Sequence, residues 1–76
     1  MKKPVKSTDP RKQLIMSMFK ECVGCNKVTM VTEVGENVFV ANCLKGGRSG
    51  YEQLGMFKIT VSGDWSKGTV VYEREA

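Results

Sequence analysis

One stretch of helical periodicity, residues 9–25, constrains the fold most, because almost everything after it is rich in β-forming residues. Asp9 occupies an N-cap position, and Pro10 follows at the first helical position. Apolar residues then recur along one side of a helix: Leu14, Ile15, Met18, Phe19, Cys22 and Val23. Gly24 is a suitable C-terminal stop. We therefore predict a helix over residues 10–23.

The apolar face of this helix covers about half of its circumference, which is wide for a surface helix. The simpler interpretation is that the whole face covers a sheet. The alternative is that part of it, Met16 with Leu14 or Met18, faces a second subunit or a protein partner.

Four later segments carry β-branched and aromatic residues and predict strands: 27–34, 37–44, 54–62 and 69–73. Residues 35–37 have turn chemistry, so the first two strands form a hairpin. Two registers stay open, one placing Val34 opposite Val38 and one placing Glu33 opposite Val38. Residues 45–50 are expected as a loop, 51–53 as a single turn, 63–68 as a second connection, and 74–76 as a frayed end.

This order predicts an α+β fold in which a single N-terminal helix packs on a four-stranded antiparallel β-meander. The alternative is a small curled β-barrel with one helix. Residues 9–76 are expected to form one compact domain. Residues 1–8 show no periodicity and are expected to be a flexible basic arm.

Positive charge is concentrated at the start of the chain. The net charge is +4, but residues 1–20 alone carry six basic residues against one acid. A basic segment attracts acidic partners such as nucleic acid, an anionic membrane or an acidic protein face. The alternative is a solvated tail that keeps a small protein soluble.

The three cysteines include a C-x-x-C at Cys22 and Cys25, with Cys43 further on. A structural zinc site needs four ligands, and the chain has no histidine, so these residues are only weak metal candidates. A redox role is also disfavoured, because reactive C-x-x-C cysteines lie at helix N-termini and this pair lies at a C-terminus. We interpret Cys22 and Cys43 as core residues and Cys25 as incidental, with no metal and no cofactor.

Two loops contain residues suited to binding. Lys45, Arg48 and Ser49 lie among glycines that let backbone N–H groups approach an anion, although the P-loop pattern is absent. Trp65 lies in a polar loop beside Lys67 and suits a protein contact or base stacking. The simpler interpretations are a flexible connection for the first loop and a Trp65 that closes one end of the core.

The sequence offers few catalytic groups, because it has no histidine to act as a general base near neutral pH. We expect no enzymatic activity. An odd cysteine count argues against a disulfide framework and favours a reducing, cytoplasmic setting. No apolar run approaches the roughly 18 residues of a membrane span. The apolar run after the basic start is too short for a signal peptide.

Two classes of function follow. The first is a small effector or inhibitor that binds a larger protein machine, such as a nucleic-acid enzyme, with a homodimer through the helix as one possibility. Its predicted contact residues are Arg11, Lys12, Met16, Lys20, Arg48, Tyr51, Trp65 and Lys67. The alternative is a nucleic-acid-binding module. Its predicted contact residues are Lys2, Lys3, Lys6, Lys45 and Arg48.

Overall fold

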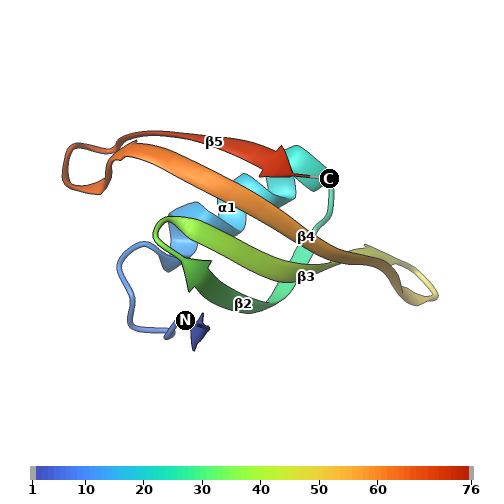
Figure 1. Ribbon diagram of the computed structural model, residues 1–76. Helices are drawn as coiled ribbons and strands as arrows, with labels where there is room; N and C mark the ends of the chain where they lie inside the picture. The colour runs from blue at the N-terminus through green and yellow to red at the C-terminus, as the bar shows by residue number, and fades with distance from the viewer. Residues whose placement is uncertain (1, 76) are drawn as a thin grey trace.

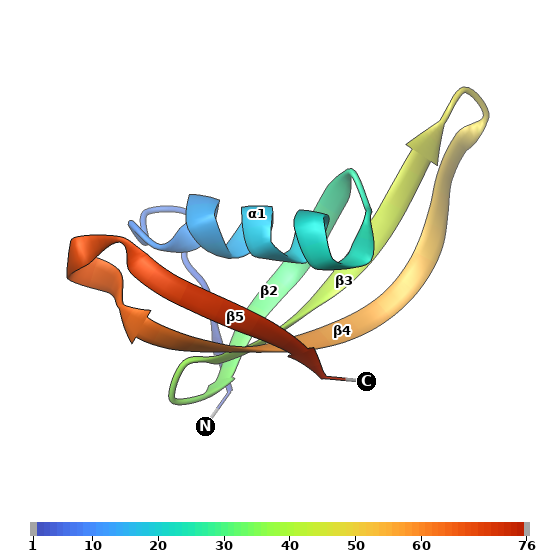
Figure 2. The same cartoon turned by 90° about the horizontal axis from the view of Figure 1, so that it is seen from above.

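The computed structural model describes residues 2–75 and places one α-helix on one face of a five-stranded antiparallel sheet (Figures 1 and 2). The helix α1 spans Lys12–Val23, and a short 3₁₀-helix, η1, spans Trp65–Lys67. The strands are β1 (Lys3–Pro4), β2 (Lys27–Gly35), β3 (Val38–Gly47), β4 (Gly50–Asp64) and β5 (Thr69–Glu75).

The strands lie side by side in chain order, β1-β2-β3-β4-β5, and each neighbouring pair is antiparallel. The α+β meander predicted from the sequence is therefore confirmed, with β1 as an added strand. The sheet does not close, since β1 and β5 form its two edges. The alternative of a small barrel is wrong.

The core lies between α1 and the face of the sheet that α1 covers. Ile15, Met18 and Phe19 are the buried helix residues. Strands β2, β3 and β4 supply the other side of the core, and the buried residues alternate along β3 and β4. The buried strand residues are Val28, Val31, Phe39, Ala41, Cys43, Ile59 and Val61. Met18 is therefore core, and it cannot be part of an exposed helix surface.

The helix begins at Lys12, two residues later than predicted. The predicted N-cap at Asp9 is wrong, because Arg11 occupies that position and no side chain caps the helix. The Asp9 carboxylate instead accepts a hydrogen bond from the backbone N–H of Arg11 at 2.8 Å, in the turn that leads into the helix. The end at Val23 is as predicted. Gly24 takes the left-handed conformation at φ 76° and donates its N–H to the carbonyl of Lys20 at 2.9 Å.

The β2–β3 hairpin has a register that neither sequence alternative contained. Gly35 pairs with Val38, and Glu33 pairs with Phe39. A bulge between Glu33 and Gly35 absorbs the difference, and Asn37 takes a left-handed φ of 58° in the turn. Turn composition alone does not reveal a bulge, which is why the sequence left the register open.

Residues 45–50 are not an open loop, and residues 51–53 are not an isolated turn. Strand β3 continues to Gly47 and β4 starts at Gly50, so the two strands form one long hairpin that turns at Arg48 and Ser49. Figure 2 shows its end projecting beyond α1. Asn26 supports the base of this projection, since its side chain accepts a hydrogen bond from the N–H of Gly46 at 2.6 Å.

The N-terminal segment is partly ordered by the sheet. Lys3 pairs with Glu33 and Pro4 with Thr32, and the N–H of Val5 donates to the carbonyl of Val31 at 2.9 Å. At the other end, β5 includes Arg74 and Glu75, which were expected to fray. Met1 and Ala76, which belong to the predicted arm and frayed end, lie outside the described residues. Within residues 2–75, no helix is long and apolar enough to cross a membrane.

Candidate functional site

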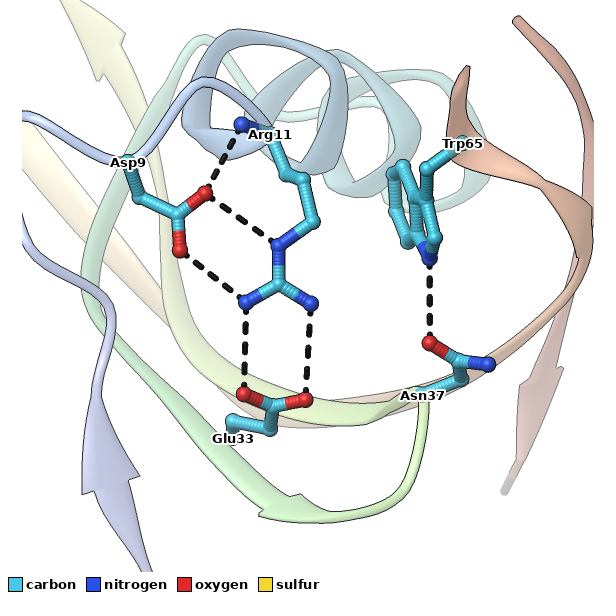
Figure 3. Close-up of polar contacts among 5 residues, drawn as sticks. All are labelled: Asp9, Arg11, Glu33, Asn37 and Trp65. Carbon is cyan, nitrogen blue, oxygen red and sulfur yellow. Dashed lines mark hydrogen bonds and ion pairs between the residues drawn. The ribbon is translucent and has the colours of Figure 1, made fainter. Parts of the chain in front are cut away.

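An ion-pair cluster joins the start of α1 to the end of β2 (Figure 3). The guanidinium of Arg11 contacts the carboxylate of Asp9 at 3.0 Å and that of Glu33 at 3.3 Å. Hydrogen bonds from Arg11 lower the pKa of Asp9, and those two carboxylates in turn raise the pKa of Arg11. The positive charge of Arg11 is thus balanced inside the molecule.

Trp65 lies next to this cluster and is held from three sides. Its indole N–H donates to the side-chain oxygen of Asn37 at 3.0 Å, as Figure 3 shows. Its ring meets the ring of Phe39 edge to face, with centroids 6.2 Å apart. The Arg11 guanidinium lies 5.6 Å from the Trp65 ring and 5.5 Å from the Phe39 ring.

The short helix η1 that carries Trp65 is capped by Asp64. One carboxylate oxygen of Asp64 accepts hydrogen bonds from the backbone N–H and the hydroxyl of Ser66, at 2.9 and 2.6 Å. These bonds lower the pKa of Asp64. The turn between β4 and β5 is therefore fixed locally, and Trp65 is fixed with it.

A surface groove of about 450 Å³ lies where the start of α1 faces η1. We call it the Trp65 groove. Its lining residues are Pro10, Arg11, Leu14, Trp65 and Ser66. Leu14 is 39% exposed, a high value for a leucine that belongs to the apolar side of a helix. The groove thus offers an open apolar surface whose aromatic wall is held in place by internal contacts.

Only two of the predicted protein-contact residues, Arg11 and Trp65, meet in this groove. Lys12 and Met16 line a separate hollow of about 230 Å³ with Pro4, Val5 and residues 28–31. Lys20 is exposed further along α1, and Lys67 is exposed at the end of η1.

Arg48 and Tyr51 lie at the far end of the β3–β4 hairpin, where Arg48 is in the turn. Tyr51 is 60% exposed, and the ammonium group of Lys27 lies 4.7 Å from its ring centroid. Since Gly50 starts β4 and Asp64 ends it, Tyr51 and Trp65 are at opposite ends of a 15-residue strand. The predicted contact residues do not form one site.

The residues of the nucleic-acid alternative are also separated. Lys3 pairs with Glu33 near the end of β2, and Lys2 and Lys6 are exposed on either side of β1. Lys45 pairs with Glu52 at the other end of the sheet, next to the turn that holds Arg48. The basic N-terminal segment and the basic hairpin therefore do not form a continuous surface.

The cysteines pack in or against the core, with two changes from the prediction: Cys25 is a core residue and not incidental, and Cys22 lies at the edge of the core. Cys25 and Cys43 are buried, whereas Cys22 is only half-buried. Burial raises the pKa of the Cys22 thiol, and burial together with Cys25 raises that of Cys43 to about 12. Within the part of the chain that the structure describes, no group of three or more metal-ligating side chains is assembled.

The sequence pointed to Trp65 and Arg11 but not to the residues that hold them. The sequence places Asn37 in a turn and at the start of a strand, and it places Glu33 in a strand whose register stays open. Both lie more than 20 positions from their partners, so no local spacing could connect them. The sequence places Leu14 on the apolar face of the helix and offers it as one alternative for an exposed residue there. A comparison with known proteins finds no match to any family model, curated protein or solved structure.

Proposed function

We propose that this chain is a small non-catalytic module that binds a protein partner through the Trp65 groove. The observation that supports this proposal is the exposed Leu14 beside the half-buried Trp65, whose ring is held by internal contacts. Tryptophan, with arginine beside it, is the residue type most enriched at the energetic centres of protein interfaces. The fixed Trp65 ring also lowers the ordering entropy that binding would cost.

The partner chemistry that fits this groove is an apolar side chain presented by a protein surface. Because Arg11 is already neutralised by Asp9 and Glu33, the groove has no strong need for a charged ligand. An effector or inhibitor that occupies a surface on a larger protein machine, such as a nucleic-acid enzyme, fits this description. The absence of histidine and the raised thiol pKa values support a non-catalytic role.

The test is affinity capture from the source cell, with and without nuclease, using wild type and two charge variants. Leu14→Asp places a carboxylate in the Trp65 groove and is expected to abolish capture. Ser17→Asp is the matched control, because Ser17 is exposed on the next turn of α1 and lies outside the groove. Equal capture by both variants, with folding verified by circular dichroism, would contradict the proposal.

A second candidate function is nucleic-acid binding by the end of the β3–β4 hairpin. The favouring observation is that Lys45, Arg48 and the Lys27–Tyr51 pair share this projecting end. Basic side chains beside an exposed aromatic ring suit phosphate contact and base stacking.

This second function predicts salt-dependent affinity for mixed single-stranded DNA or RNA. Arg48→Ala is expected to weaken binding. It is also expected to reduce the slope of the logarithm of the binding constant against the logarithm of the salt concentration by about one. Lys67→Ala is the control, since Lys67 lies in η1, just beyond the opposite end of β4. No binding at low salt would remove the nucleic-acid function and leave the protein-binding proposal standing.

A further inference from the structure

The two edges of the sheet differ in how well they are protected from pairing with another chain. At the β2 edge, β1 and Val5 cover residues 31–33, and a bulge with Met30 at φ 55° interrupts the strand next to them. Covering segments and bulges are two devices by which natural sheets prevent edge pairing. The β2 edge is therefore a poor template for an added strand.

The β5 edge has neither device. Its seven residues pair with β4 without a register shift, and no strand lies beyond it in the described part of the chain (Figure 1). One side of the β5 backbone therefore faces solvent along a regular strand. Val71, next to the central residue of β5 and on the face away from α1, is 67% exposed. A regular strand edge with an exposed valine is an open template for another strand.

We propose that a second copy of this chain pairs with the β5 edge, so that two β5 strands run antiparallel about a two-fold axis. The axis is normal to the sheet, because only that orientation brings identical edges together antiparallel. Both copies of α1 then lie on the same face of one continuous sheet. The interface lies at the β5 edge, and not on the helix face considered from the sequence.

The residue pattern of β5 fits itself best in one register. With Val71 opposite Val71 of the second copy, Val70 lies opposite Tyr72 and Thr69 opposite Glu73, which its hydroxyl can bond. This register places apolar residues together on both faces and sets no like charges against each other. A register centred on Glu73 would place two carboxylates opposite each other, which is destabilising.

The other charged residues of β5 are already engaged within their own sheet. Glu75 forms an ion pair with Lys58 at 3.0 Å and accepts a hydrogen bond from the hydroxyl of Thr60 at 2.8 Å. The Arg74 guanidinium lies 5.7 Å from the ring of Phe57, and it donates to the carbonyl of Cys22 at 3.5 Å. Covering the edge therefore leaves neither of these charged side chains without a partner.

Paired strands of this length form an interface smaller than the usual stable kind, so the dimer is weak and concentration-dependent. Analytical ultracentrifugation from about 5 µM to about 1 mM is expected to show a shift from monomer to dimer. Val71→Lys places two ammonium groups opposite each other and is expected to raise the dissociation constant at least roughly tenfold. Ser62→Lys is the control, because Ser62 neighbours Val71 on β4, one strand away from the edge.

Cysteine cross-linking tests the register without depending on the stability of a lysine variant. In a Cys22→Ala background, Val71→Cys is expected to form a disulfide-linked dimer on mild oxidation, whereas Ser62→Cys is not. Thr69→Cys and Glu73→Cys are expected to cross-link when mixed, and neither alone. A monomer over the whole concentration range, or equal cross-linking by Ser62→Cys and Val71→Cys, would overturn the proposal.

Discussion

At the scale of single residues, Arg11 connects more of the molecule than any other side chain described here. It bonds Asp9 before the helix and Glu33 on β2, and it lies over the rings of Phe39 and Trp65. An ion pair on an open surface contributes little stability, because water and salt screen it. Here the three charged side chains are at most 27% exposed, so the contribution is larger.

Arg11→Gln is therefore expected to destabilise the fold by roughly 1–3 kcal/mol, since it leaves two half-buried carboxylates without their partner. Urea unfolding followed by circular dichroism measures this change. Arg48→Gln removes the same charge from an exposed turn and is expected to stay within about 0.5 kcal/mol of wild type. Equal effects of the two changes would show that the cluster is not stabilising.

The same cluster predicts an acid dependence. Because Arg11 depresses the pKa of Asp9 in the folded state, the unfolded chain binds more protons as the pH falls. The stabilisation by Asp9 is fully present above the unfolded pKa of about 3.9 and is lost as the pH falls through the lower, folded value.

Urea midpoints measured between pH 6 and pH 2 check this dependence. Asp9→Asn is expected to lower stability near pH 6 and to flatten the fall below pH 4. Glu36→Gln is the control, because Glu36 makes no ion pair within residues 2–75. If the urea midpoints of wild type and Asp9→Asn fell in parallel from pH 6 to pH 2, ionised Asp9 would not be the source of the acid dependence.

At the scale of elements, the long strand β4 determines how the molecule is laid out. It carries the projecting hairpin at its start and the turn with Trp65 at its end. Gly63 lets β4 approach the neighbouring strand β5 closely at that second end. A Cβ at this position would overlap the carbonyl oxygen of Thr69, and the backbone φ of +112° is already unfavourable for other residues.

Gly63→Ala is thus expected to cost more stability than the roughly 1–3 kcal/mol of backbone strain alone. Gly50→Ala separates the two effects, because Gly50 has a similar φ of +123° but open space around a built Cβ. Thermal unfolding of both variants provides the comparison. Equal melting temperatures would mean that steric overlap with β5 does not matter.

At the scale of the whole molecule, one aromatic residue reports on packing between distant parts of the chain. Trp65 is the only tryptophan, and it contacts Phe39 on β3, Asn37 in the β2–β3 turn, and Arg11 before α1. All of these contacts depend on the sheet and the helix being in place together.

Tryptophan fluorescence and far-ultraviolet circular dichroism are accordingly expected to give the same urea midpoint, as in two-state unfolding of a small domain. The measurement needs only the wild-type protein. An earlier fluorescence transition would show that η1 detaches before the sheet melts. In that case, the aromatic wall of the Trp65 groove would not be rigid before binding.

The sequence by itself determined the helix, its glycine stop, an antiparallel meander for the helix to cover and most of the buried side of the helix. Periodicity and turn chemistry are local signals, and a chain of this size has few ways to cover one sheet with one helix. The same local signals gave a wrong prediction for residues 45–50, where a glycine-rich composition is typical of a loop. Glycines at 46, 47 and 50 suggested a loop, yet cross-strand hydrogen bonding extends the hairpin through them.

Only the tertiary structure decided which residues from distant parts of the chain meet. Trp65 and Leu14 are about 50 positions apart, and Arg11 finds Glu33 across 22 positions. The tertiary structure also shows that the basic residues divide between two ends of the sheet. It further shows that the two sheet edges differ in how well they are protected from pairing with another strand. These facts depend on strand register and on the bulges within it, which arise from long-range pairing and side-chain packing and not from any local pattern.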